Sequence, residues 1–128
     1  MRNAWLRSAL LVMVVLASGA CARPVGSDAA VELGEFWITP DVRVLQTGAI
    51  ELDVENYGEF PHTLVVSDAS GTVIAASDLI APEEEIGLEL NLAPGVYMFS
   101  CRIVLSLEDG TLVDHYQEGM AASIEVVG

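Results

Sequence analysis

Apolar and polar residues alternate along much of the chain. Ile50, Leu52 and Val54 are separated by acidic residues, and residues 86–92 alternate in the same way. Because successive side chains of a strand point to opposite faces, this period of two predicts strands with one buried face. The one stretch that favours a helix is the apolar run near the N-terminus.

Turn-forming residues separate the alternating segments at regular intervals. We therefore expect an all-β, antiparallel sandwich whose short strands follow one another through tight turns. The predicted turns are at Pro40-Asp41, Thr47-Gly48, Asn56-Tyr57-Gly58, Ala69-Ser70-Gly71, Ala81-Pro82 and Ala93-Pro94-Gly95.

The N-terminus has the three parts of a secretory signal. Two arginines precede an apolar run over residues 9–17, and small residues follow it up to Cys21. The run is too short for a durable membrane span, so we expect residues 1–20 to be a signal helix that is cleaved. Residues 17–21 resemble a bacterial lipobox, which predicts a diacylated Cys21 as the new N-terminus. Ordinary cleavage beside small residues is the alternative.

Either route exports the protein, to the periplasm or the outer face of the cell membrane, where a lipid on Cys21 would anchor it. Residues 21–30 are then a short tether, and residues 31–128 form a single domain of common size. The chain has two cysteines. Processing at Cys21 therefore leaves Cys101 as a lone thiol, and a disulfide between the two is the alternative only if Cys21 is retained unmodified.

The region after the signal is strongly acidic. It carries all 19 acidic residues and no lysine, with Arg23, Arg43 and Arg102 as its fixed positive charges. Nucleic acid is excluded as a partner, because phosphate contacts need clustered Lys and Arg. Anionic lipids would repel the domain, so a membrane location requires the acyl anchor. The charge suits steering toward a redox protein with a basic docking face, and adaptation to high salt is the alternative explanation.

The most informative residues for function are His62, Cys101, His115 and Met120. The chain has only two histidines, and one thiolate, two imidazoles and a weak thioether are the donors of a mononuclear blue-copper site. Singly, Cys101 and Met120 fit a hydrophobic core, His62 fits a buried strand and His115 fits a solvated loop. All four together favour one copper site. No serine has an available histidine base, so no catalytic constellation is evident.

The order of these residues resembles that of the cupredoxin family. In that family one His lies on a mid-chain strand, a Cys ends a late strand, and a His and a Gly-Met pair lead into the last strand. Residues 31–127 follow this order with His62, Cys101, His115 and Met120. The resemblance implies a Greek-key β-sandwich that binds one Cu(I)/Cu(II) ion and carries single electrons, and that is not an enzyme.

The resemblance also implies roles for individual residues. Thr63 stands where many members have Asn, and its hydroxyl is expected to make a similar supporting hydrogen bond beside the site. His115 is expected to be the most exposed ligand and the port through which electrons pass.

The chain departs from the family between Cys101 and His115. Thirteen residues separate them, where most members have two to four. Residues 102–114 read as two apolar stretches around Asp109-Gly110, a strong hairpin signal. Strict pairing across a two-residue turn would place His115 opposite Val104, so we expect the pairing to break before the ligands. We further expect this hairpin to shape the docking of partners.

Two other functions fit parts of the pattern. A protein that captures or delivers copper would exchange the ion itself, and the complete Cys and two-His set argues against this because open, Met-rich sites suit transfer better. A cupredoxin-like interaction module that has lost its metal is the second alternative.

Overall fold

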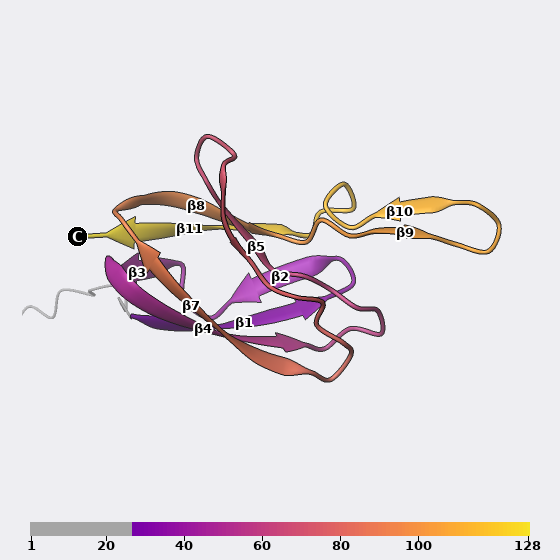
Figure 1. Cartoon of the computed structure of the whole chain (residues 1–128), viewed down its shortest axis with the longest axis horizontal. Coiled ribbons are helices and arrows are strands. Elements are labelled where there is room, and N and C mark those ends of the chain that lie inside the picture. Colours follow the sequence, from indigo (N-terminus) through magenta and orange to yellow (C-terminus); the bar gives the residue numbers. More distant parts are fainter. Residues whose placement is uncertain (1–26) are drawn as a thin grey trace, which may run out of the picture.

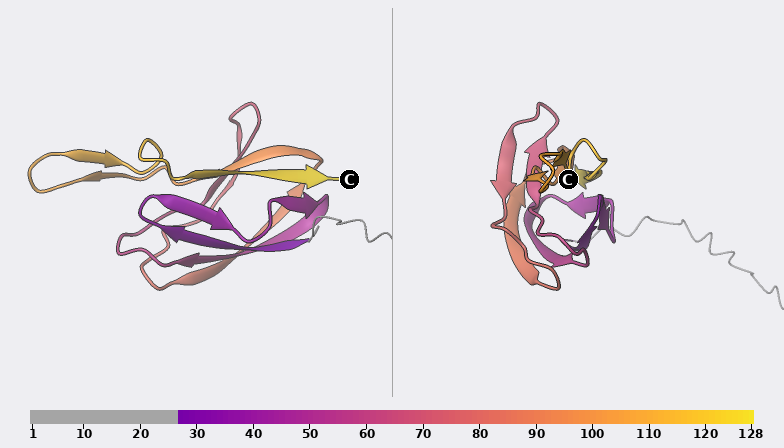
Figure 2. Two further views of the ribbon diagram at one scale, coloured as in Figure 1. Left: turned by 180° about the vertical axis from the view of Figure 1, so that it is seen from behind. Right: turned by 90° about the vertical axis from the view of Figure 1, so that its right-hand side faces the viewer.

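The computed structural model describes residues 27–128, which form two sheets packed face to face and one separate hairpin (Figure 1, Figure 2). The predicted signal segment and Cys21 lie outside the described residues. The first sheet has the order β2-β1-β4-β7 and contains β1 (Asp28–Gly34), β2 (Trp37–Pro40), β4 (Gly48–Asn56) and β7 (Glu85–Leu92). The second sheet has the order β3-β11-β8-β5-β6 and contains β3 (Val44–Gln46), β5 (Val65–Asp68), β6 (Val73–Ala76), β8 (Gly95–Ser100) and β11 (Ala121–Val127). The hairpin consists of β9 (Val104–Ser106) and β10 (Leu112–Asp114).

The predicted all-β sandwich is confirmed, but its sheets are mixed and not purely antiparallel. β1 runs parallel to β4, and β3 runs parallel to β11, while the other paired strands are antiparallel. Alternation of apolar residues reports which face of a strand is buried and carries no information about the direction of its neighbour. The two parallel pairs were therefore missed.

The alternation predicted the buried face of β4 correctly. Ile50, Leu52 and Val54 are at most 2% exposed, and the two acidic residues between them are exposed to solvent. The same pattern on β7 buries Leu90 and Leu92, while the first half of that strand stays partly exposed because β7 lies at the edge of its sheet.

The sandwich begins before the boundary we expected. β1 starts at Asp28, and Ala29 is 4% exposed in the core. Residues 28–30 of the predicted tether pair with residues 51–53 of β4. The described residues 27–128 contain no helix long and apolar enough to cross a bilayer.

A hairpin lies between Cys101 and His115 and projects from one end of the sandwich (Figure 1). Its loop has three residues, 108–110, because Leu107 and Thr111 are hydrogen-bonded across it. Gly110 takes the left-handed conformation at φ 82°, as such loops require. The predicted two-residue turn at Asp109-Gly110 was therefore wrong by one residue.

The longer loop changes which residue faces His115. Asp114 pairs with Val104, and the His115 N–H donates to the Ile103 carbonyl at 3.0 Å. The ladder ends there, before Cys101. The hairpin is therefore closed at its base next to the candidate ligands.

Candidate metal centre

His62 lies in the loop between β4 and β5, which backbone and side-chain hydrogen bonds hold in place. Its N–H donates to the Ile80 carbonyl at 3.0 Å, and the Ile80 N–H donates back at 2.8 Å. The buried Asn56 amide donates to the carbonyls of Phe60 and Ile80, and its oxygen accepts from the Gly58 N–H. Asn56 thus fixes both sides of the loop. Its sequence signal was the turn prediction at Asn56-Tyr57-Gly58.

Cys101 directly follows β8 and is fully buried. Its N–H donates to the Met120 carbonyl at 3.2 Å, which continues the pairing of β8 with β11 by one residue. The Met120 N–H in turn donates to the His115 carbonyl at 3.0 Å. Two backbone hydrogen bonds therefore link three of the four predicted ligand residues.

His115 directly follows β10 and begins a tight loop that leads to β11. The Asp114 carboxylate accepts hydrogen bonds from the backbone N–H groups of Tyr116 and Gln117 and so fixes the start of this loop. Gly119 has φ 107° near its end, a value that favours glycine. The loop returns the chain to Met120 beside Cys101. Sequence reasoning missed Asp114, although an Asp that accepts from N–H groups two or three residues later is a common turn signal.

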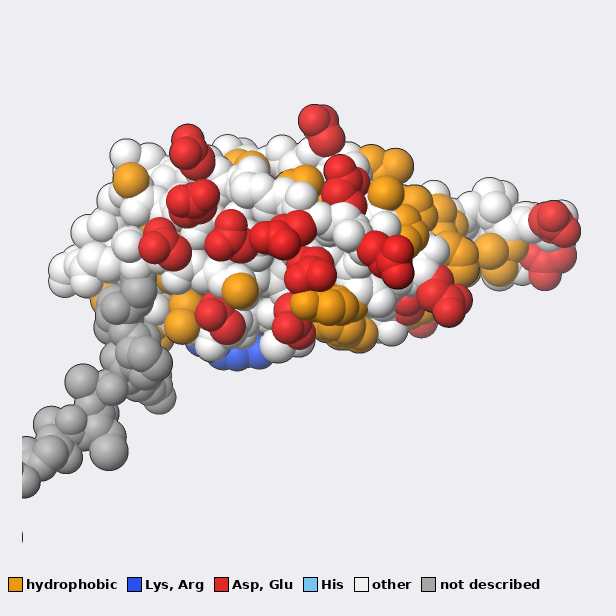
Figure 3. Space-filling model, turned by 90° about the horizontal axis from the view of Figure 1, so that it is seen from below, with side chains coloured by type: hydrophobic (Ala, Val, Ile, Leu, Met, Phe, Trp, Pro, Cys, Tyr) orange, Lys and Arg blue, Asp and Glu red, His pale blue; other side chains and the backbone are white. Residues whose placement is uncertain are grey.

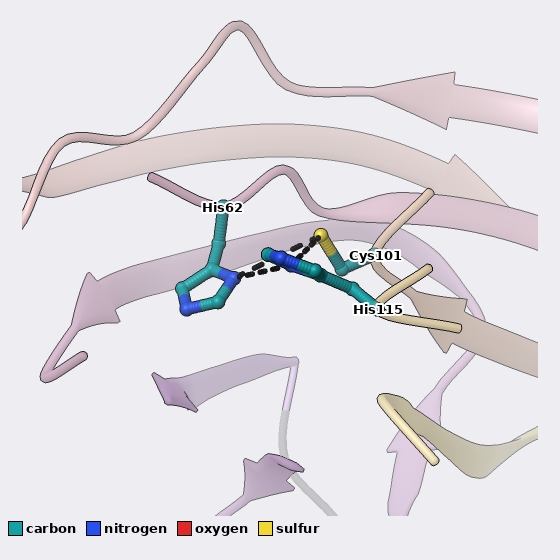
Figure 4. A group of neighbouring side chains, drawn as sticks. All are labelled: His62, Cys101 and His115. Atoms are coloured by element: carbon teal, nitrogen blue, oxygen red, sulfur yellow. Dashed lines mark hydrogen bonds between the residues drawn. The ribbon is translucent and has the colours of Figure 1, made fainter. Parts of the chain in front are cut away.

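The side chains of His62, Cys101 and His115 converge in the interior (Figure 4). The Nδ1 atoms of the two histidines are 3.1 Å apart, and the Cys101 Sγ lies 3.9 Å from the His62 Nδ1 and 3.5 Å from the His115 Nδ1. All three residues are fully buried, and their ligand atoms lie within 4.8 Å of one another. The group is able to hold one metal ion.

Met120 is fully buried in the same region of the core. Its backbone contacts with Cys101 and His115 bring it beside the cluster. Its role as an axial sulfur donor stays a prediction.

Thr63 contacts the Cys101 sulfur in two ways. Its backbone N–H donates to Sγ at 3.5 Å, and its hydroxyl oxygen lies 3.8 Å from Sγ. Hydrogen bonds to the sulfur are one of the means by which a protein tunes a copper–thiolate site.

The turn between β1 and β2 supplies two contacts that sequence reasoning missed. The Glu35 carboxylate lies 3.1 Å from the His62 Nε2. The Phe36 ring packs edge-on against the His115 ring, with centroids 5.0 Å apart. Both residues precede His62 by more than 25 positions, and no local pattern connects them to the histidines.

His115 is not the exposed ligand that the resemblance implied. It is fully buried, and its Nε2 has no hydrogen-bond partner among the described residues. The packing of Phe36 against its ring contributes to this burial. The prediction was wrong because it came from the family resemblance and took no account of Phe36, which packs on the ring.

The ionisation of Cys101 and His62 is coupled. Burial alone would raise the pKa of the Cys101 thiol, but hydrogen bonds from His62 and from the Thr63 backbone lower it. Burial alone would lower the pKa of His62, but its contacts with Cys101 and Glu35 raise it. Thiolate and imidazolium therefore stabilise each other in the metal-free protein.

His115 behaves differently. Burial and the nearby charge of His62 lower the pKa of its imidazole. A metal ligand must be neutral imidazole, and this environment favours that form.

No protein-family model matches the sequence, and no curated protein resembles it at a significant level. Solved structures do resemble it in shape. This chain has the cupredoxin fold.

Three cupredoxins illustrate the likeness. Auracyanin A of Chloroflexus aurantiacus, a "blue" copper protein, is 15% identical with a TM-score of 0.54, covering 78% of this chain and 99% of its own. A purple cupredoxin from Nitrosopumilus maritimus is 15% identical with a TM-score of 0.52, covering 78% and 100%. Rusticyanin from Thiobacillus ferrooxidans is 12% identical with a TM-score of 0.53, covering 80% and 79%. Identities this low show the fold alone.

The donors of this cupredoxin-fold chain fit copper. One thiolate and two imidazoles in a buried site are the donor set of blue-copper centres, whereas structural zinc takes four protein ligands in a closed tetrahedron. Both imidazoles present the same nitrogen, Nδ1, toward the sulfur.

Proposed function

We propose that this protein binds one copper ion through His62, Cys101 and His115, with Met120 as a weak axial donor, and carries single electrons between redox proteins. The observation that supports this most strongly is the convergence of two Nδ1 atoms and one Sγ in a fully buried cluster. Copper in such a donor set supplies one-electron chemistry by alternating between Cu(I) and Cu(II).

The surrounding chain holds the donors still. His62 is held through its backbone bonds to Ile80, and Cys101 through its backbone bond to Met120, the residue directly before β11. Ligands fixed in this way would keep nearly the same positions around Cu(I) and Cu(II). Electron transfer would then require little movement of the ligands. Burial of all three excludes bulk water from the donors.

The charge and exposed apolar side chains of the surface favour binding to a protein partner with basic groups. Acidic side chains are spread over the face drawn in Figure 3, and apolar side chains lie along its projecting end. On the hairpin, Val104 and Leu112 are more than half exposed, and Glu108 and Asp109 occupy its loop. An apolar strip beside acidic groups suits a partner that presents an apolar patch with basic residues around it.

We also propose export and a lipid anchor on Cys21, which rest on the sequence of the N-terminal segment. Mass spectrometry of the protein purified from membranes tests this. A diacylated Cys21 at the N-terminus is the expected result, and an unmodified N-terminus at residue 21 or 23 in a soluble extract contradicts anchoring.

The test of the function is stoichiometric loading of the metal-free protein with Cu(II), followed by absorption spectroscopy and electrochemistry. We expect one equivalent to bind, an intense thiolate-to-Cu(II) charge-transfer band in the visible, and reversible loss of the band on one-electron reduction. A colourless protein that holds only Cu(I) would favour copper delivery. Absence of binding would favour an interaction module without metal.

A further inference from the structure

The turn between β1 and β2 makes a different contact with each of the two histidines. At His62, the Nε2 atom lies 3.1 Å from a carboxylate oxygen of Glu35. At His115, the corresponding Nε2 is buried and has no partner among residues 27–128, and the ring meets the Phe36 side chain instead. The Nε2 atom of His62 is therefore hydrogen-bonded to a carboxylate, whereas the Nε2 atom of His115 is not.

The Glu35 carboxylate is held in this position by its neighbours. Its Oε1 atom also accepts the Phe60 N–H at 2.9 Å. Gly58 lies so close that a Cβ there would overlap the carboxylate, so the absence of a side chain at Gly58 makes room for it. The side chain of Glu35 is only 26% exposed.

An ionised carboxylate accepts hydrogen bonds and cannot donate them. When His62 is neutral, its proton is therefore on Nε2, and Nδ1 keeps a lone pair facing Cys101 and His115. This is the tautomer that a metal ligand needs at Nδ1. The bond also orients the ring, because Glu35 is itself fixed by Phe60.

We propose that Glu35 is a positioning residue for His62. Its negative charge, acting through the hydrogen bond to the imidazole, favours Cu(II) over Cu(I) and so lowers the reduction potential of the site. A carboxylate hydrogen-bonded to a ligating histidine increases the basicity of that ligand, and a more basic ligand stabilises the more highly charged ion to a greater extent. This inference rests on the proposed copper function and adds to it a specific determinant of the potential.

Glu35→Gln tests the effect of the negative charge, since glutamine keeps an oxygen that can accept a hydrogen bond from the Nε2–H group. We expect the midpoint potential of the copper-loaded protein to rise by about 59 mV, which is about a tenfold shift in the preference for Cu(I) over Cu(II). Glu59→Gln is the matched control, because it removes the same charge from the adjacent exposed loop and keeps the backbone unchanged. It should leave the potential nearly unaltered.

Glu35→Ala and Gly58→Ala test the positioning. The first removes the acceptor, and the second displaces the carboxylate while retaining its charge. In the metal-free protein, at a pH high enough for His62 to be neutral, ¹⁵N NMR of the imidazole should show His62 predominantly protonated on Nε2 in the wild type. This preference should weaken in both variants.

Two results would overturn the proposal. One is a potential that moves equally in Glu35→Gln and Glu59→Gln. The other is an unchanged His62 tautomer in Glu35→Ala. If the wild-type protein instead forms no thiolate–copper band, the copper function fails, and the NMR measurement still decides whether Glu35 positions His62.

Discussion

The ligand cluster and the β9–β10 hairpin are neighbours along the chain, but they are held by different forces. Cys101 and His115 are fully buried and both hydrogen-bonded to Met120, directly before β11, whereas Leu112 on the hairpin is 68% exposed. The two hairpin strands pair only with each other. The sandwich therefore sets the arrangement of the donors, and the insertion adds surface without supporting the core.

Closure at the base explains how the site tolerates the insertion. The His115 N–H bonds to the Ile103 carbonyl, and the Cys101 N–H bonds to the Met120 carbonyl. Whatever lies between Ile103 and His115 is thus outside the cluster. Lengthening a loop whose ends are already joined costs little free energy.

Replacing Cys101 with Ser should have the largest effect. The change keeps the volume nearly constant and removes the only sulfur in the described cluster able to act as a thiolate. We expect complete loss of the thiolate–copper band, with the fold retained in far-UV circular dichroism. A variant that kept the colour would exclude the proposed ligand set.

The second contrast concerns stability. Phe99 is fully buried on β8, and Leu112 is exposed on the hairpin. We expect Phe99→Ala to lower the free energy of unfolding by about 3–5 kcal/mol, and Leu112→Ala to change it by less than about 0.5 kcal/mol. Urea denaturation of the metal-free variants measures both. Similar losses would mean that the hairpin packs on the sandwich.

Shortening the hairpin distinguishes its effect on copper binding from its effect on docking of the redox partner. Replacing Leu105–Val113 with Asn-Gly keeps Val104 paired with Asp114 across a favourable two-residue turn. We expect the copper band to persist and electron transfer to a basic cytochrome c, used as a probe, to slow about tenfold.

Its matched control is the double variant Glu108→Gln, Asp109→Asn, which removes the same loop charges and keeps the hairpin. Stopped-flow rates with the probe should fall less in the control than in the shortened protein. Equal rates in the shortened and wild-type proteins would remove the hairpin from the docking surface.

Met120→Leu should have the smallest effect. The side chain is fully buried, so leucine fills a similar space. We expect copper and colour to be retained and the reduction potential to rise, by about 59 mV or more, because a weak axial donor is withdrawn. Protein-film voltammetry measures the shift. An unchanged potential would show that the Met120 sulfur is not a donor.

Local sequence patterns predicted what depends on local physics. The alternation around Leu52 predicted the buried face of β4, and the Asp109-Gly110 pair predicted a hairpin, although its loop is one residue longer. The parallel pairing of β1 with β4 depends on how distant strands pack, which alternation does not report.

The site shows the same limit. His62, Cys101 and His115 could be selected because their side chains are rare donors in this chain, but Glu35 could not, since acidic residues are abundant and it acts from a turn 27 positions away from His62. The burial of His115 was missed because Phe36, which packs on its ring, lies 79 positions earlier in the chain.

X-ray absorption spectroscopy at the copper edge tests the central claim most directly, because it reports the atoms bound to the metal in solution. A protein loaded with one equivalent of copper should show one short sulfur scatterer together with two imidazole rings, and Cys101→Ser should lose the sulfur contribution. A shell of oxygen and nitrogen alone in the wild-type protein would contradict the proposed copper centre.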